Sequence, residues 1–236
     1  MAKLRLQITK DNEIRYVSHL DFAGTIERAV RRAKLPAAYS EGFNPHMKLA
    51  FASALAVGVT SEAEYLDLEL TEEVDVAHVE AKLKPELPAG IELKAAKYMR
   101  ERSQALMAVV NLATYEIVVP LASDTIWDTV ETSLEKFNNE VEVIYIKQTP
   151  KGRREIDIKE YLAAPARVRQ DSNQKMIISL SIKITPGGSV KPAEVLASLT
   201  DSFGLPVDKD SALINRTGLL VTDGRVQLSP LQLSRD

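Results

Sequence analysis

The residues best suited to acid–base chemistry are two histidines and an aspartate. His19 and Asp21 stand two positions apart in the run SHLD, and His46 follows an Asn-Pro turn. Histidine titrates near neutral pH, so an enzyme would use these three residues as acid, base or ligand. His19 also falls on the apolar side of a helical wheel, where a histidine packs in a core or at a cap. We take packing as the leading interpretation of His19.

Neither a metal site nor a cofactor is expected. The chain has no cysteine, which excludes disulfides, thiolate zinc sites, iron–sulfur clusters and a cysteine nucleophile, and which suits a reducing cytoplasm. The run Gly187-Gly188-Ser189 lacks the spacing of a phosphate-binding loop. The metal-capable side chains show no HExxH or comparable spacing; they are His19, His46, Glu62, Glu64 and Asp67.

The densest group of functional residue types is the segment Tyr39–His46, with the sequence YSEGFNPH. Gly42 permits a positive φ and Pro45 fixes the chain just after it, which predicts a rigid loop with its aromatic and histidine side chains in set directions. Such a loop could stack on a base or meet a phosphate. Alternatively, Phe43 plugs a sheet edge and Asn44 caps the turn. The candidate binding residues of this loop are Tyr39, Ser40, Gly42, Phe43, Asn44 and His46.

A second candidate binding surface is the polar side of the helix that follows Ser18. Arg28 and Arg32 lie opposite its apolar side on a helical wheel. Two guanidinium groups one turn apart could bind phosphates or carboxylates. The leading alternative for this stripe alone is a solvated helix face on which Glu27 pairs with Arg31.

A third candidate is a basic hairpin. The run Thr149-Pro150-Lys151-Gly152 fits a turn with proline second and glycine fourth, and Arg153 and Arg154 follow it. Together with Lys147, they concentrate positive charge at a tip that could grip a nucleic-acid backbone without reading its sequence. The leading alternative is a charged tip with no partner.

Composition and charge limit these options. The 236 residues carry a net charge of −3, which excludes a globally basic nucleic-acid binder. The net charge is +4 over residues 1–50 and +3 over 151–236, whereas 51–100 and 101–150 each carry −5. An acidic molecule can therefore present a local basic face. No run of about 18 apolar residues and no secretory signal is present, so we expect a soluble, cytoplasmic protein that makes no contact with a membrane.

Strand alternation and helical spacing predict an α+β protein in which the order βαββαβ occurs twice. The elements expected in the first half are a strand at 4–8 with a short continuation at 14–17, a helix at 18–34, strands at 48–57 and 64–70, a helix at 75–83 and a strand at 91–98. In the second half they are a strand at 115–120, a helix at 124–137, strands at 141–147 and 175–184, a helix at 192–199 and a last strand within 206–221.

A doubled βαββαβ order is the split-βαβ, ferredoxin-like arrangement. We therefore expect two tandem ferredoxin-like halves with antiparallel sheets, residues 1–102 and 103–236, joined by a helix near 103–113. We also expect the Tyr39–His46 loop to lie beside the start of the helix at Ser18, because the chain must turn back along the same sheet.

The chain resembles a bacterial family known as the radical-SAM-associated or radical-SAM-linked protein. The resemblance covers nearly the whole chain, and the run YSEGFNP after SHLD is its most specific part; Met47 stands where members often have a second proline. The matching residues are Arg15, SHLD (18–21), RAVRRAKLP (28–36), YSEGFNPH (39–46), GVTSEAEYLD (58–67), LPAGI (87–91), KGRREIDIK (151–159) and GGSVKPAEVL (187–196). Arg15 is a further candidate binding residue.

The resemblance implies a radical-SAM enzyme as partner and an association with ribosome-related genes, but no established reaction. The chain has no CxxxCxxC motif, so it cannot perform radical-SAM chemistry itself. The leading hypothesis is an RNA-binding or substrate-presenting module that acts with such an enzyme; it is more a binding module than an enzyme. The alternatives are a nucleotide- or RNA-processing enzyme using His19, Asp21 and His46, and a protein–protein scaffold for the radical-SAM partner.

Overall fold

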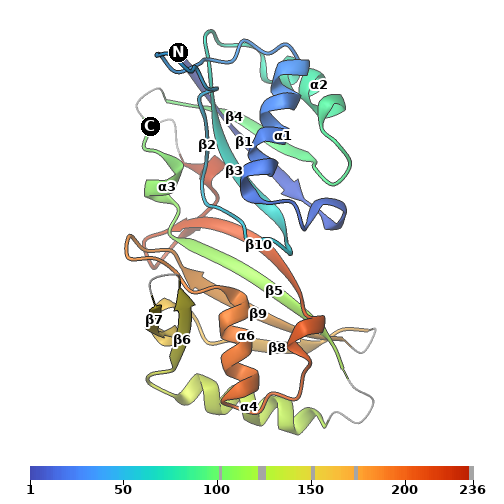
Figure 1. Cartoon of the computed structure of the whole chain (residues 1–236), viewed down its shortest axis with the longest axis vertical. Helices are drawn as coiled ribbons and strands as arrows, with labels where there is room; N and C mark the ends of the chain where they lie inside the picture. Colours follow the sequence, from blue (N-terminus) through green and yellow to red (C-terminus); the bar gives the residue numbers. More distant parts are fainter. Residues whose placement is uncertain (101–102, 122–125, 150–151, 173–174, 234–236) are drawn as a thin grey trace. The chain divides into compact units, whose positions relative to one another are not determined.

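The computed structural model describes residues 1–100, 103–121, 126–149, 152–172 and 175–233. Contacts within the chain divide it into two compact units, which we call unit 1 (residues 1–111 and 218–236) and unit 2 (residues 112–217). In each unit, helices accompany a sheet (Figure 1). This division differs from the expected halves because residues 218–236 belong to unit 1.

Unit 1 begins with the expected order βαββαβ. No strand forms at 14–17: the 3-10 turn η1 ends at Ile14, and residues 15–17 form a turn and bend that lead into the first helix. The elements of unit 1 are β1 (Ala2–Lys10), η1 (Asn12–Ile14), α1 (His19–Arg32), β2 (Leu49–Phe51), β3 (Val59–Leu70), α2 (Val76–Leu83), η2 (Lys84–Glu86), β4 (Leu93–Met99), α3 (Leu106–Val109), β11 (Gln227–Leu228) and η4 (Pro230–Gln232).

The sheet of unit 1 is built around β3. Its strand order is β4-β1-β3, and β3 also pairs with β2 and neighbours β10. The pairings of β1 with β3 and β4, and of β2 with β3, are antiparallel. Alternate residues of these strands point to one face, where Leu4 and Leu68 pack with Phe22 and Ile26 of α1 in a single buried core. Helices α1 and α2 therefore cover this face of the sheet (Figure 1).

The opposite face of the same sheet is closed by a buried ion pair and by the C-terminal segment. Arg5 and Asp67 are cross-strand partners. The Nε and Nη2 atoms of Arg5 donate to the two carboxylate oxygens of Asp67 at 2.7 and 2.9 Å, and its Nη1 donates to the carbonyl of Pro230 at 2.9 Å. Lys97 Nζ donates to the carbonyl of Leu231 at 2.8 Å. The 3-10 turn η4 is thus fixed over the sheet by two cationic donors.

The expected basic hairpin is present in unit 2, and it is an addition to the βαββαβ order. The elements of unit 2 are β5 (Leu112–Pro120), α4 (Trp127–Asn139), β6 (Ile144–Thr149), β7 (Gly152–Asp157), α5 (Ile158–Tyr161), β8 (Arg167–Gln170), β9 (Lys175–Lys183), α6 (Pro192–Asp201), η3 (Lys209–Ser211) and β10 (Leu213–Thr222), the last of which continues into unit 1.

The main strand order of unit 2 is β10-β5-β9-β8, and β9 pairs antiparallel with both of its neighbours. Strands β6 and β7 form a separate two-stranded sheet. The segment 141–147 was therefore wrongly assigned to the main sheet, where β8 takes its place. Alternating residues identify a strand but not its partner, and the four-residue β8 has too little pattern to be recognised.

The α+β class is confirmed, and the large sheet is mostly antiparallel among the described residues. The expected connecting helix at 103–113 is present only as the short α3, because β5 already begins at Leu112. Within the described ranges, no helix is both long and apolar enough to cross a membrane.

Breaking the ion pair should strongly destabilise unit 1. Replacing Asp67 by Ala leaves the guanidinium of Arg5 buried without its carboxylate, so we expect a loss of about 3–5 kcal/mol in the free energy of unfolding, measured by urea denaturation. The double variant Arg5→Met/Asp67→Leu should recover most of that loss, because it removes both charges. The control Glu92→Ala breaks the exposed Lys94–Glu92 pair and should cost less than about 0.5 kcal/mol. Equal losses in the Asp67 and Glu92 variants would contradict this role.

Candidate functional site

The start of α1 is fixed by a cap and by a buried turn. The hydroxyl of Ser18 accepts a hydrogen bond from the backbone N–H of Asp21 at 3.2 Å, which is the first half of the expected capping box. It also donates to the Asp21 carboxylate at 2.7 Å, in place of the reciprocal backbone bond of a full box. Arg15 is buried and donates from Nε and Nη2 to the carbonyl of Gly58 at 3.0 and 2.6 Å. The Nζ of the fully buried Lys10 donates to the carbonyls of Arg15 and Val17. Arg15, one of the candidate binding residues, is therefore turned into the fold, where it holds the turn before α1 against the loop at Gly58.

His19 packs against the core of unit 1. Its ring lies edge-on to that of Phe51, with the centroids 5.1 Å apart, and Phe51 in turn contacts Phe22. Asp21 is exposed and is occupied by the cap. The arrangement matches the packing interpretation of His19.

The Tyr39–His46 segment forms a closed loop with an aromatic tip. Tyr39 and Met47 form a β-bridge, and the N–H of Ser40 donates to the carbonyl of His46 at 2.8 Å. The hydroxyl of Ser40 lies 2.8 Å from His46 Nδ1 and also accepts from the His46 N–H. Gly42 has a φ of +116°, as the sequence led us to expect.

The side chain of Phe43 is completely exposed, and that of Tyr39 is 43% exposed. The alternative in which Phe43 plugs a sheet edge is therefore wrong. Asn44 is exposed as well, and no side-chain cap from it is seen within the described residues. A closed loop thus presents two aromatic rings to solvent in a fixed orientation.

This loop lies beside the end of α1, not beside its start as we expected. The N–H of Ala38 donates to the carbonyl of Glu69, near the end of β3, whereas Lys10, beside the start of α1, pairs with Ser61. Eight residues of strand, about 27 Å, separate Glu69 from Ser61. Helix α1 runs back along the sheet, so a loop that follows it begins at the far end (Figure 1). His46 is therefore not brought within hydrogen-bonding reach of His19 and Asp21.

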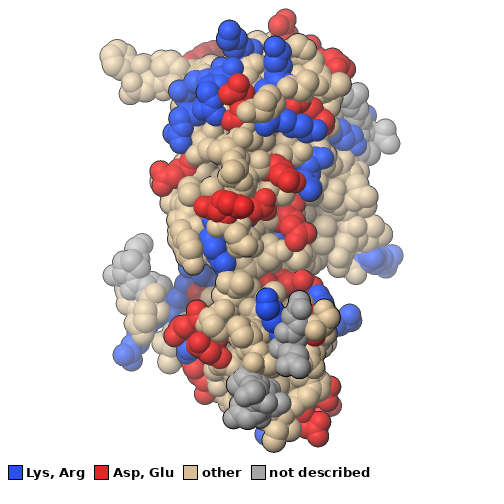
Figure 2. All heavy atoms as spheres, turned by 90° about the vertical axis from the view of Figure 1, so that its right-hand side faces the viewer, with Lys and Arg blue, Asp and Glu red and all other residues tan. Residues whose placement is uncertain are grey.

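Basic side chains accompany the loop at the end of α1. Arg31 pairs with Glu27 at 3.3 Å, and Arg32 pairs with Glu86 at 2.8 Å. The Nη2 of Arg28 donates to the hydroxyl of Thr25 at 3.0 Å. Lys34, just after the helix, is exposed with a φ of 54°. The remaining cations of this end are Arg28 and Lys34, and Figure 2 shows lysine and arginine side chains gathered near the top of unit 1, above a band of acidic ones.

In the hairpin β6–β7 of unit 2, the two arginines point to opposite faces. Arg153 pairs across the strands with Gln148, and Arg154 with Lys147. Lys147 Nζ lies 2.7 Å from the carboxylate of Glu194, so the face of Arg154 is turned toward α6. Lys151 lies outside the described residues. Arg153 and Arg154 thus cannot grip one backbone together from the same face.

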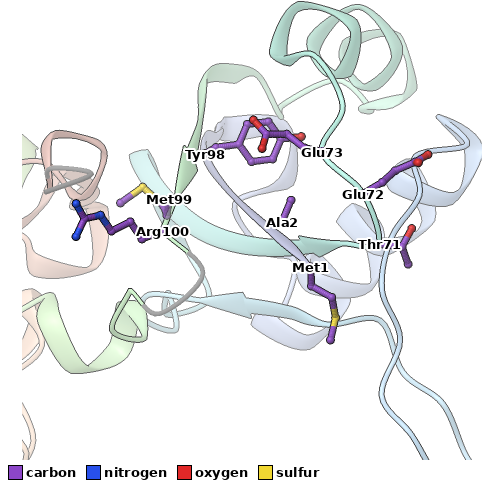
Figure 3. A pocket seen from close by; sticks show the side chains of 8 residues that line it. All are labelled: Met1, Ala2, Thr71, Glu72, Glu73, Tyr98, Met99 and Arg100. Atoms are coloured by element: carbon purple, nitrogen blue, oxygen red, sulfur yellow. The ribbon is translucent and has the colours of Figure 1, made fainter.

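The described residues of unit 1 line more than one hollow. A cavity of 260 Å³ between β2 and α3 includes His46. A larger one of 480 Å³ lies where β1 begins and β3 and β4 end. Glu72 and Glu73 line it on one side and Arg100 on the other (Figure 3). Burial raises the pKa of Tyr98 in its wall, and the Tyr98 hydroxyl is bonded to the backbone of Val74. This hollow contains none of the expected site residues.

The described part of the chain holds no group of three or more metal-capable side chains close enough to bind an ion. Of the polar residues around the 260 Å³ cavity, only His46 and Asp67 were recognisable in the sequence. Lys3, Lys48 and Glu69 stand in or beside ordinary alternating strands, and only the strand register brings them together.

Residues 3–192 match the model of a family described as "Uncharacterized protein conserved in bacteria". A chain in the crystal structure of a Cbf5-Nop10-Gar1 complex is similar in fold, with a TM-score of 0.50 and 11% sequence identity over 92% of this chain. The present chain covers 48% of that one, about half its length. The encapsulated DyP-type peroxidase from Mycobacterium smegmatis aligns over 90% of this chain and 89% of its own, with a TM-score of 0.24 and 9% identity. No curated protein matches.

The loop should lose its rigidity when the Ser40 hydroxyl is removed. Ser40→Ala deletes both side-chain hydrogen bonds to His46, so amide hydrogen exchange at residues 40–46 should accelerate about tenfold, which corresponds to about 1.4 kcal/mol. The amides of β2 are the internal control and should not change. Unaltered exchange in the loop would show that its backbone bonds alone close it.

Proposed function

This chain belongs to DUF2344, a family of uncharacterized proteins conserved in bacteria, and we propose that it is an RNA-binding module that presents RNA to a radical-SAM enzyme. The observation that carries the proposal is the closed loop with the fully exposed Phe43 beside a basic helix end. An exposed aromatic ring can stack on any base, and nearby cations can bind the phosphates that follow it.

The enzyme alternative has less support. Catalysis by His19, Asp21 and His46 needs the three groups within reach of one another, yet His19 packs on Phe51 and His46 belongs to the loop at the other end of β3. A binding module needs only the exposed loop.

A radical-SAM enzyme as partner is supported by the resemblance of the SHLD and YSEGFNPH runs to the radical-SAM-linked family. The cysteine-free chain cannot hold the iron–sulfur cluster of such chemistry, so the partner must supply it. One observation favours a protein contact at the start of α1. Tyr16, Leu20 and Val57 are 74%, 82% and 58% exposed there, an unusual group of large apolar side chains. In this proposal, the partner and the RNA occupy opposite ends of unit 1.

We also propose that the chain is a duplication of two ferredoxin-like halves, residues 1–102 and 103–236. The first set of six elements ends with β4 at Met99, and the second begins with β5 at Leu112. The order β4-β1-β3-β2 in the first is repeated as β10-β5-β9-β8 in the second, with β6 and β7 inserted. The fold-level likeness at a TM-score of 0.50 covers 92% of the chain, so it includes both halves.

RNA binding should depend on Phe43 and on the cations near it in two distinguishable ways. With single-stranded RNA of 12 nucleotides, the slope of log affinity against log salt should be near −3 for about four contacts, since each contributes about −0.7. Phe43→Ala should weaken binding by about 1–3 kcal/mol with the slope unchanged, because stacking releases no counterions. Arg28→Ala/Lys34→Ala should flatten the slope by about 1.4. Fluorescence anisotropy at several salt concentrations measures both quantities.

The matched control is Lys94→Ala, which removes an exposed lysine of β4 that pairs with Glu92. It should leave affinity and slope unchanged. If the unaltered protein shows no binding at low salt, the RNA proposal fails and the scaffold alternative takes its place.

If the hairpin also contacts RNA, only the arginine on the face away from Lys147 and Glu194 should matter. Arg153→Ala should flatten the salt slope by about 0.7, whereas Arg154→Ala, on the face of Lys147 and Glu194, should not. The same anisotropy titration tests both. Equal effects of the two variants would contradict the assignment of faces.

A further inference from the structure

The cavity between β2 and α3 lies on the face of the unit 1 sheet opposite to α1 and α2. Leu68 packs in the helix-side core, so its neighbours Asp67 and Glu69 point to the opposite face. Ala50 is the cross-strand partner of Asp67, and Lys48 Nζ lies 3.4 Å from the Glu69 carboxylate. These side chains form the floor of the cavity.

The cavity combines apolar walls with a polar floor. Leu106 and Met107 of α3 form one wall, and Met107 is 74% exposed at its mouth. Lys3 Nζ donates to the carbonyl of Ser103 at 2.9 Å, which ties the segment before α3 to β1. The volume of 260 Å³ is below the roughly 300–1,000 Å³ of sites for whole small ligands, so it suits one planar ring.

His46 connects this cavity to the aromatic loop. It lines the cavity and also closes the loop through Ser40, so Phe43 and the cavity are held by the same short segment. A strand of RNA with one base on Phe43 can therefore place another base in the cavity.

The two carboxylates indicate which base fits. Asp67 is held by both nitrogen donors of Arg5, and its side chain is 8% exposed. Glu69 is 35% exposed and makes only the 3.4 Å contact with Lys48 among the ion pairs of the described residues, so its carboxylate has acceptor positions left. An acidic side chain accepts from the exocyclic amino group of a base, as with N4 of cytosine, whereas uracil offers an oxygen there.

We infer that the cavity between β2 and α3 binds one amino-bearing nucleobase of a single-stranded RNA, with Glu69 accepting from the amino group and Met107 against the ring. This rests on the proposed RNA binding and adds to it a site and a base preference. Polarizable sulfur makes favourable contacts with aromatic rings.

Oligo(C) and oligo(U) RNAs of 12 nucleotides test the inference, because the two bases have the same ring size and differ at position 4. The unaltered protein should bind oligo(C) about tenfold more tightly than oligo(U), the effect of one hydrogen bond to a carboxylate. Glu69→Gln should abolish or reverse the preference, since an amide can donate to the uracil oxygen. The charge that this variant removes affects both RNAs alike, so the ratio of the two affinities reports the base contact alone.

Ala50→Phe fills the floor and should also abolish the preference, leaving the binding that depends on Phe43. Ala54→Phe, at an exposed position after β2, is the matched control and should preserve the ratio. As a direct measurement, the ¹³C-methyl resonance of Met107 should shift on titration with cytidine monophosphate and much less with uridine monophosphate.

The outcomes separate the two proposals. Absence of binding to either RNA refutes the proposed function. Binding with equal affinities for oligo(C) and oligo(U), unaffected by Ala50→Phe, overturns the base site and leaves RNA binding in place. Urea denaturation of Glu69→Gln and Ala50→Phe checks that both remain folded. If either does not, the Met107 resonance of the unaltered protein tests the base site: a shift with cytidine monophosphate supports it, and equal shifts with both nucleotides overturn it.

Discussion

The buried pair of Arg5 and Asp67 is the constraint on which the arrangement of unit 1 depends. The two residues are opposite each other on β1 and β3, so a shift of register by one residue would place two charges in the apolar core. The guanidinium of Arg5 donates hydrogen bonds to both carboxylate oxygens of Asp67 and to the carbonyl of Pro230. A single cross-strand pair thus fixes the register of the sheet and holds the C-terminal segment on its open face.

The consequences of that register extend along β3 in both directions. Two residues beyond Asp67, Glu69 reaches the cavity floor, and its carbonyl accepts from Ala38 at the base of the loop. Toward the other end, Ser61 pairs with Lys10, whose amino group holds the turn before α1. The aromatic loop and the capped helix start are therefore placed by the same strand, about 27 Å apart. Their separation is a property of the sheet and not of either loop.

Local chemistry was visible in the sequence, whereas long-range placement was not. The cap at Ser18, the positive φ of Gly42 and the alternation of β5 and β9 depend on neighbouring residues, and each matches its local pattern. The hairpin β6–β7 alternates as regularly as a strand of the main sheet, so its residues could not reveal that it pairs only with itself. The face of β1 and β3 that carries Arg5 and Asp67 is covered by the C-terminal segment at Pro230, more than 160 residues after Asp67. No local sequence pattern encodes a contact over that distance.

The exposed Phe43 is best understood through the cost of holding it in place. A large aromatic side chain in water gains nothing from burial. Folding alone therefore gives no reason for a loop closed by three hydrogen bonds between Ser40 and His46 around such a tip. Restricting the loop before binding lowers the entropy lost when a partner arrives. In the proposed complex with RNA, the rigidity lowers the entropy cost of binding, and a flat ring presented this way fits a surface that is itself flat. An unstacked base has that shape, and the cations at the end of α1 are suited to the phosphates on either side of it.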